Sequence, residues 1–457
     1  MFNTIQLAKS SPSPLYLQLA NGLSQLIETG QLPSGTKLPS IRSLARELKI
    51  NRDTVVSAYN LLEQRGLAYG QTGRGTYVSP PPNLPSLNTP TLEPFFLAHK
   101  DCINFSSISL PDDCFPIAAL EEVVLGVLSN QQWDAFYDYD GTQSQRLLEE
   151  ICNYFKTQLI QATPKQIRII QSISQLIQSL PKFTNRPGIC VESPSMDLSI
   201  FKEYGFEPFE VPLDQDGMNM EVLECHLKTG KIQYVYVMPC LQNPTGICYS
   251  KQRKQHLLTL AKAYNVYVIE TDIFSDLLLK DSSYVPLYFQ TSDKNVIYIK
   301  YFSQLYLPNL HYSFVVLPNA LSNINTKSHP YNFTDSIFYT FLHTHIWQVH
   351  KQHLMKHYNE KYLTVCYLID LHLSSYISYT SKFGGIYIWL TLETPHITLD
   401  DLCDALIAHH ILVSPGTLFF THKTNPPCMR LSIARTSMAQ IERGIKVMGF
   451  ILSQSLI

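Results

Sequence analysis

Residues 234–246, YVYVMPCLQNPTG, decide the fold class of the larger part of this 457-residue chain. The run YVYV consists of β-branched and aromatic residues, and the polar turn 242–246 follows it closely. A short apolar run without polar alternation is typical of a strand that is buried on both faces. The turn therefore lies at the carboxyl end of a strand, where ligands of parallel sheets bind.

Similar runs recur on both sides of this stretch and alternate with helical patterns from about residue 115 onward. They are IRII (167–170), GICVES (188–193), VYVIETD (266–272) and VIYIKYF (296–302). Alternation of this kind predicts an α/β fold in which a mostly parallel sheet is flanked by helices. Residues that contact a ligand are expected just after these runs.

The first 78 residues follow a different pattern. An amphipathic segment from Leu15 to Ile27 precedes LPSIRSLARELKI (38–50) and NRDTVVSAYNLLEQRGL (51–67), which predict two short helices. Ser40 and Asn51 are suited to cap them, and the second carries Val55, Val56, Tyr59 and Leu62 on one face. Two short helices at this spacing are typical of a helix-turn-helix. The segment AYGQTGRGTYVS that follows predicts a hairpin with Gly73 and Gly75 at its turn.

Charge is unevenly distributed between these two parts. The first 78 residues contain eight Lys and Arg against four Asp and Glu, and the remainder contains 27 against 33. A basic head on an acidic body favours a head that meets polyanions. Residues 79–100 are rich in proline and predict a linker between a head at 10–78 and a body at 101–457.

The head resembles the winged helix-turn-helix domain of the GntR family of bacterial regulators, on the segments LPSIRSLA, the Arg-Asp-Thr start of the second helix, and GRGTYV. By matching position, Arg42, Arg52 and Thr54 would touch double-stranded DNA, and Arg74 would reach it from the wing. The free N–H groups at the start of the second helix favour phosphate there. An arginine in this first turn can also pair with a guanine edge.

The body is similar to fold-type-I aminotransferases on its QNPTG (242–246), ETDIFSDL (270–277) and MRLSIAR (429–435) segments. A GntR head joined to such a body resembles the MocR subfamily of transcription regulators. The resemblance implies pyridoxal phosphate (PLP) as cofactor, with Asp272 on its ring nitrogen, Asn243 on its ring oxygen and Arg430 on a substrate carboxylate. A carboxylate keeps the ring nitrogen protonated, and the planar fork of arginine suits a carboxylate.

Departures from the family pattern weigh against transamination. The lysine that the family uses to bind PLP covalently is replaced by Gln304, and an amide forms no Schiff base. A phosphate-contacting arginine is replaced by His311, and a tyrosine by Phe274. Met196 stands where the family places an aromatic ring over the cofactor. We therefore predict that PLP, if bound at all, is held noncovalently.

The phosphate turn after IRII is also altered, because Ile173 replaces a glycine. Ser174 and its neighbours Ser172 and Gln175 are left as weaker phosphate contacts. Lys300 is four residues before Gln304, which places it roughly 13 Å away along an extended strand. We therefore expect it to lie beyond easy reach of the lysine position.

Three hypotheses follow. The first is a cytoplasmic, DNA-binding regulator whose body forms a homodimer on a paired operator and senses PLP or an amino-acid-like effector. The alternative is a PLP-dependent aminotransferase with an accessory head. The third is a body that binds no cofactor and only pairs the heads.

The sequence favours neither a metal site, nor disulfides, nor a membrane anchor. The ten cysteines contain no CxxC pair, and the histidines lack a carboxylate at zinc-motif spacing. No signal-like N-terminus or run of about 18 apolar residues is present, which predicts a cytoplasmic protein.

Overall fold

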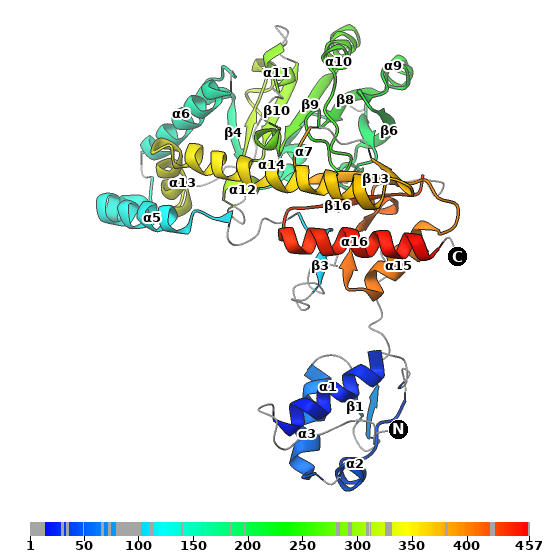
Figure 1. The fold of residues 1–457 in the computed structure, drawn as a ribbon. Helices are drawn as coiled ribbons and strands as arrows, with labels where there is room; N and C mark the ends of the chain where they lie inside the picture. Colours follow the sequence, from blue (N-terminus) through cyan, green and yellow to red (C-terminus); the bar gives the residue numbers. More distant parts are fainter. Residues whose placement is uncertain are drawn as a thin grey trace. The chain divides into compact units, whose positions relative to one another are not determined.

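The computed structural model describes residues 14–28, 32, 36–48, 50–64, 68–71, 75–78, 102–108, 114–138, 140–158, 160–182, 185–195, 198–279, 284–290, 295–307, 310, 312–324, 331–379, 383–420 and 426–455. These residues form two compact units, within residues 1–92 and 93–457. We call them the head and the body (Figure 1). The predicted linker at 79–100 lies outside the described residues, so the predicted domain boundaries remain predictions.

The head consists of three helices and a two-stranded antiparallel sheet. Its elements are α1 (Leu15–Glu28), α2 (Ile41–Glu47), α3 (Arg52–Gln64), β1 (Ala68–Gln71) and β2 (Gly75–Val78). The hydroxyl of Ser40 accepts a hydrogen bond from the Ser43 amide at 3.2 Å and caps α2. Val56 was expected on the buried face of α3 but is exposed. The buried side chains of α3 are instead spaced by three and four residues: Val55, Ala58, Tyr59 and Leu62.

The body is built on an eight-stranded mixed sheet in the order β4-β11-β10-β9-β8-β5-β6-β7. Its strands are β4 (Ile167–Ile170), β5 (Gly188–Ser193), β6 (Glu207–Asp214), β7 (Gly217–Met218), β8 (Ile232–Val237), β9 (Tyr267–Asp272), β10 (Val296–Lys300) and β11 (Ser313–Val316). The five strands from β10 to β6 run parallel. All six residues of β8 are buried, which confirms the prediction from the YVYV run.

Helices flank this sheet and alternate with its strands. They are α6 (Thr142–Thr157), α7 (Ile173–Ser179), α8 (Leu198–Glu203), α9 (Met220–Lys228), α10 (Lys251–Ala263), α11 (Leu287–Gln290), α12 (Phe302–Tyr306) and α13 (Phe333–His343). A further helix, α5 (Ile117–Gln131), packs on α13. One core cluster joins α7 and α8 to the inward side chains of the strands, among them Ile269, Ile297 and Ile299. The odd-numbered apolar residues of β10 therefore point away from Tyr298 and Lys300.

A smaller antiparallel sheet, β12-β13-β16-β15, stands beside the large one. Its strands are β12 (Ile377–Tyr379), β13 (Tyr387–Leu392), β15 (Ser414–Pro415) and β16 (Cys428–Ser432). A separate parallel pair joins β3 (Ile103–Asn104) to β14 (Ile411–Leu412). The long helix α14 (Ile346–His372) crosses in front of the large sheet and packs on α16 (Met438–Gln454), while α15 (Leu399–Ala408) also contacts α16 (Figure 1). Among the described residues, no helix has the length and apolar character needed to cross a membrane.

Candidate functional site

Three neighbouring parallel strands deliver two predicted pocket residues and one lysine to the same edge of the large sheet. Asn243 follows β8, Asp272 ends β9, and Lys300 ends β10. Lys300 and Asp272 are paired in register across β10 and β9. Residues paired in this way point to the same face of a parallel sheet, with backbones about 4.8 Å apart. Register therefore places a lysine beside the aspartate.

The Asp272 carboxylate is saturated by donors from the chain itself. Its Oδ1 accepts hydrogen bonds from the Ser275 amide at 3.1 Å and from Lys300 Nζ at 3.2 Å. Its Oδ2 accepts bonds from the Ser275 hydroxyl at 2.7 Å and from the Tyr298 hydroxyl at 2.6 Å. A carboxylate offers about four lone-pair sites, so the four donors fill them.

Lys300 bridges two buried carboxylates. Its Nζ lies 2.9 Å from Asp276 Oδ2 in addition to its contact with Asp272. Burial alone would lower the pKa of Lys300, but the charges of Asp272 and Asp276 raise it above its ordinary value. Lys351 of α14 contacts the other oxygen of Asp276. Despite burial, Lys300 and Lys351 hold the pKa of Asp276 below its usual range.

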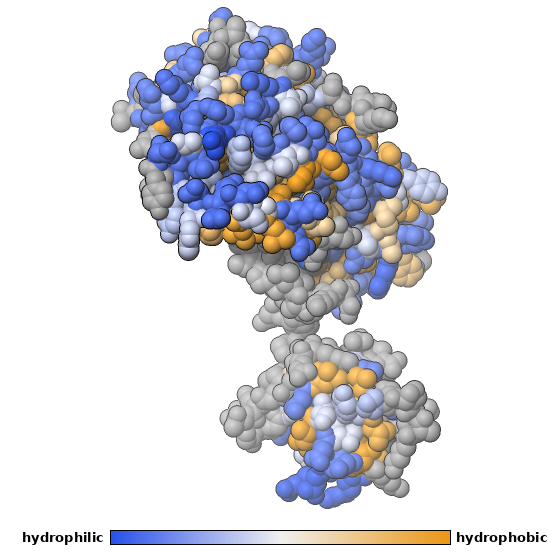
Figure 2. Space-filling view, turned by 90° about the vertical axis from the view of Figure 1, so that its left-hand side faces the viewer, coloured by the Kyte–Doolittle hydropathy of each residue, from blue (hydrophilic) through white to orange (hydrophobic). Residues whose placement is uncertain are grey.

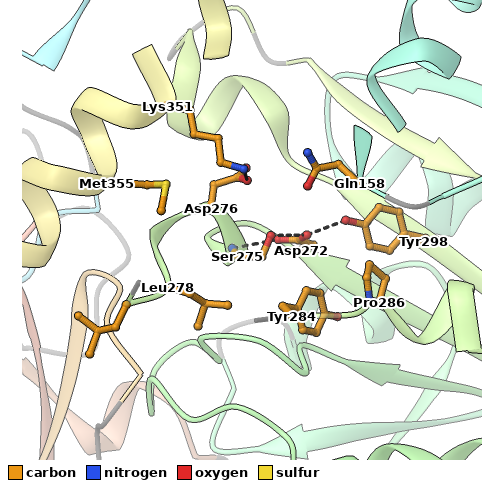
Figure 3. A pocket seen from close by; sticks show the side chains of 11 residues that line it. Gln158, Asp272, Ser275, Asp276, Leu278, Tyr284, Pro286, Tyr298, Lys351 and Met355 are labelled. Atoms are coloured by element: carbon orange, nitrogen blue, oxygen red, sulfur yellow. Dashed lines mark hydrogen bonds and ion pairs between the residues drawn. The ribbon is translucent and has the colours of Figure 1, made fainter. Parts of the chain in front are cut away.

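A hollow of about 240 Å³ opens beside this cluster. Figure 3 shows Asp272 between Ser275 and Tyr298, with Lys351 directed at Asp276. The lining includes both carboxylates but neither Asn243, Ser174 nor Arg430, so the predicted contacts do not share this hollow. Its wall is mostly polar or charged and includes residues of β9, η5 (Ser275–Leu277), β10 and α14, together with Gln158 directly after α6.

Arg430 lies on β16 of the smaller sheet and is brought to Asn243, 187 residues away. It is 3% exposed, and its hydrogen-bond partners among the described residues are neutral: Asn243 Oδ1 at 2.8 Å, the Ser106 carbonyl at 3.0 Å and the Ser414 hydroxyl at 3.2 Å. Its planar group also lies over the rings of Tyr387 and Phe419. Burial lowers its pKa.

The Arg430 guanidinium retains unused donors. Its buried Nε has no hydrogen-bond partner within the described part of the chain. No carboxylate of the described residues lies within 4.0 Å of its nitrogens. A buried cation with only neutral partners bears an unmet desolvation cost, which an anion would offset. The Arg430 guanidinium is therefore suited to pair with a carboxylate.

Other predicted pocket positions are only partly described. Ser174 is half-buried in the first turn of α7, after β4. The backbone of Gln304 belongs to α12. His311 and Met196 lie outside the described residues. Phe274 is buried and meets the ring of Tyr387 edge to face, so an apolar contact replaces the tyrosine hydroxyl of the family pattern. No group of three metal-ligating side chains occurs among the residues described.

The expectation that Lys300 lies beyond easy reach of position 304 stays a prediction, because the structure describes only the backbone of Gln304. The estimate assumed an extended chain from Lys300 to position 304, but β10 ends at Lys300 and the chain turns into α12. Its ammonium reaches the Asp272 carboxylate, which the family resemblance assigns to the ring nitrogen. A lysine that closes an otherwise apolar run, beside another run that closes with aspartate, is a signal that could have revealed this pair.

In the head, the predicted DNA contacts lie near the start of two helices. Arg42 of α2 and Arg52 of α3 are exposed, and Arg52 is the first residue of its helix. Thr54 is half-buried in the first turn of α3. Arg74 lies outside the described residues. Exposed guanidinium groups at a helix start are well placed for phosphate or base edges.

Comparisons with known proteins agree with this division of the chain. The model of "Aminotransferase class I and II" matches residues 100–448, and that of "Bacterial regulatory proteins, gntR family" matches residues 15–78. The HTH-type transcriptional regulator YdfD of Bacillus subtilis is 26% identical, over 98% of this chain and 98% of its own length. The aromatic-amino-acid aminotransferase 1 of Thermococcus litoralis is 23% identical, over 76% of this chain and 87% of its own length.

Solved structures of aminotransferases resemble a large part of this chain in fold. The kynurenine aminotransferase of Pyrococcus horikoshii superimposes with a TM-score of 0.71 and 21% identity. The superposition covers 79% of this chain and 93% of that one. This similarity confirms the predicted α/β aminotransferase fold, and the gntR match confirms the predicted winged helix-turn-helix head.

Proposed function

The chain belongs to the aminotransferase class I and II family, and from that premise we propose how its body serves a DNA-binding transcription regulator. The gntR-type head and the full-length similarity to HTH-type transcriptional regulators carry the regulatory function. In this proposal the body pairs two heads as a homodimer and binds a small amino-acid-like effector. The protein acts in the cytoplasm, where its operator DNA lies.

The exposed arginines of the head support DNA contacts at Arg42, Arg52, Thr54 and Arg74. The test measures binding of the full chain to a duplex selected from a random double-stranded library, over a series of salt concentrations. Each arginine that contacts phosphate releases counterions, so Arg42→Ala should reduce the slope of log affinity against log salt by about 1. Arg52→Ala should weaken binding to the selected duplex by about 1–3 kcal/mol if it pairs with a base.

Arg443→Ala is the matched control, because Arg443 is exposed on α16 of the body. It should leave both affinity and salt slope unchanged. The head assignment fails if Arg42→Ala and Arg52→Ala behave like the control.

Homodimer formation is supported by an apolar surface that a monomer would leave in water. The large exposed apolar residues of α5 and the turn after it are Ile117, Leu125, Leu128, Trp133, Phe136 and Tyr137. Figure 2 looks at the side of the body that carries α5 and shows apolar residues gathered there. Contiguous patches of this kind mark interaction surfaces. A second copy is the simplest partner, because paired heads need one.

The test is the molar mass of the full chain by light scattering. We expect a dimer for the wild type and a monomer for Leu125→Glu with Trp133→Glu. Phe450→Glu, a charge placed at an exposed apolar position of α16, is the control and should remain dimeric. A wild-type monomer would exclude pairing of heads through the body.

The cofactor of this fold family, PLP, fits the residues of this pocket poorly. The acceptor sites of Asp272 are filled by donors of the chain, including a cation, so none is left for a protonated ring nitrogen. The oxygen of Asn243 accepts a hydrogen bond from Arg430, which leaves its amide nitrogen as the donor for a ring oxygen, so the misfit lies at Asp272. Of the two predicted kinds of effector, PLP and an amino-acid-like compound, the contacts favour the second.

The effector proposal rests on the buried guanidinium of Arg430, which lacks an anionic partner among the described residues. Its test is thermal unfolding of the full chain against a panel of the standard L-amino acids. At least one should raise the Tm of the wild type. Arg430→Met should abolish that rise, because charged hydrogen bonds to the carboxylate are lost. Arg443→Met should retain it.

The predicted loss of transamination is tested separately. The purified chain, supplied with PLP, an amino donor and a keto acid, should show no turnover, because Gln304 offers no amine. Steady turnover would favour the alternative of an aminotransferase with an accessory head.

A further inference from the structure

The buried ends of β9 and β10 hold a closed set of four charges. Lys300 contacts Asp272 and Asp276, and Lys351 contacts Asp276. Lys300 and both carboxylates are 4% exposed or less. Two anions therefore meet two cations, and the set is neutral. Lys300 also donates to the Ser275 hydroxyl at 3.1 Å, which in turn binds Asp272.

This balance depends on Lys300. Without its ammonium, two buried carboxylates would share Lys351 alone, and Asp272 would retain only neutral donors. A buried carboxylate without a cation is strongly destabilising. The fold therefore needs one positive N–H donor on Asp272, whatever its source.

A pyridinium nitrogen is a donor of the same kind, because it carries one positive charge and one N–H. The register pair Lys300 and Asp272 supplies it from within the chain. The two cations would compete for one set of oxygens, which Ser275 and Tyr298 already share. Binding of the ring would require displacement of an ammonium into surroundings that are buried.

We propose that Lys300 is a built-in counter-ion that takes the place of a cofactor's protonated ring nitrogen on Asp272, so that the body is complete without a pyridoxal cofactor. With Gln304 in place of the family's lysine, the cofactor cannot be attached covalently. Lys300 in turn occupies the Asp272 carboxylate with which the ring nitrogen would pair. The inference concerns only the surroundings of Asp272. It does not depend on an effector at Arg430, on dimer formation or on DNA binding.

The test is calorimetric titration of the full chain with pyridoxamine 5′-phosphate, which has the ring nitrogen and phosphate but no aldehyde to react with surface lysines. Three proteins are compared: wild type, Lys300→Arg, and Lys300→Met with Asp276→Asn. The last removes one cation and one anion, so the cluster stays neutral while Asp272 loses its lysine. We expect it to bind at least about tenfold more tightly than the wild type. Lys300→Arg keeps the cation and should bind no better than the wild type.

The inference is overturned if the wild type binds as tightly as the double variant, or if Lys300→Arg gains binding equally. Should the double variant not fold, the wild type alone decides. Its Tm should be the same with and without pyridoxamine 5′-phosphate, and a reproducible rise would show that Lys300 does not exclude the ring.

Discussion

Two sites in the body treat a buried cation in opposite ways. At the Asp272 site, Lys300 is matched by two carboxylates, and the four acceptor sites of Asp272 are filled. At the Arg430 site, an equally buried guanidinium has neutral partners and an unused Nε–H among the described residues. The first arrangement is complete in itself, whereas the second lacks an anion.

This difference distinguishes a cation that belongs to the folded core from a cation that is available to a ligand. A buried cation whose charge is balanced offers nothing to a ligand, and removing it destabilises the fold because its carboxylates are left without a partner. A buried cation without an anion costs stability, and such a cost is typical of a site that a ligand completes. We infer that the charges around Asp272 belong to the core, whereas Arg430 is the place for the carboxylate of the proposed effector.

The largest effect on stability is expected when the charge balance around Asp272 is removed. Lys300→Met should lower the free energy of unfolding by about 3–5 kcal/mol, because two buried carboxylates lose their shared cation. Addition of Asp276→Asn should recover much of this loss by restoring neutrality. Urea unfolding followed by circular dichroism measures both. Equal stability of wild type and Lys300→Met would show that the ion pairs do not form in solution.

A smaller effect is expected at the Arg430 site. Arg430→Met removes a cation that no carboxylate balances, so the lost hydrogen bonds are partly offset by relief of its desolvation. We expect a loss of about 1–2 kcal/mol without effector. The same unfolding measurement checks it. A loss as large as that of Lys300→Met would contradict the proposed difference between the two sites.

The smallest effect concerns two buried groups that are neutral rather than paired. Burial, followed by the charge of His353, lowers the pKa of His350 to about 4. Its contribution to stability is present above pH 6.5 and is lost as the pH falls towards 4. Burial raises the pKa of Glu270 to about 7. Its contribution is present below pH 4.5 and is lost as the pH rises through 7.

Between pH 4.5 and 6.5, His350 makes the free energy of unfolding rise with pH and Glu270 makes it fall. The two effects should nearly cancel in the wild type. Glu270→Gln should leave the histidine slope, so stability rises with pH by about 1 kcal/mol per unit. His350→Phe should leave the opposite slope. Urea unfolding at pH 4.5, 5.5 and 6.5 measures them. Parallel profiles of all three proteins would refute the opposing protonation states.

Much of the fold could be predicted because the signals are local. Ser40 caps α2 as its position before an apolar face predicts, and the YVYV run is a buried strand. Asn243 and Arg430 were predicted to serve one pocket, and the structure brings them into contact. The role of Lys300 was missed, because distance along the chain was used where strand pairing applies. Ser275, Tyr298 and Lys351 were missed as well, since serine, tyrosine and lysine outside a motif carry no pocket signal.

The sequence by itself determined the two-part organisation, the strand and helix pattern, and the replacement of the cofactor-binding lysine by Gln304. Each depends on residue type and spacing within a short segment. Only the tertiary structure decided which charges meet. Lys300 reaches Asp272 through strand register, and Arg430 reaches Asn243 across 187 residues without an acidic neighbour among the residues described. Charge pairing in a core depends on which side chains the sheet sets side by side, and spacing along one strand does not encode its partner.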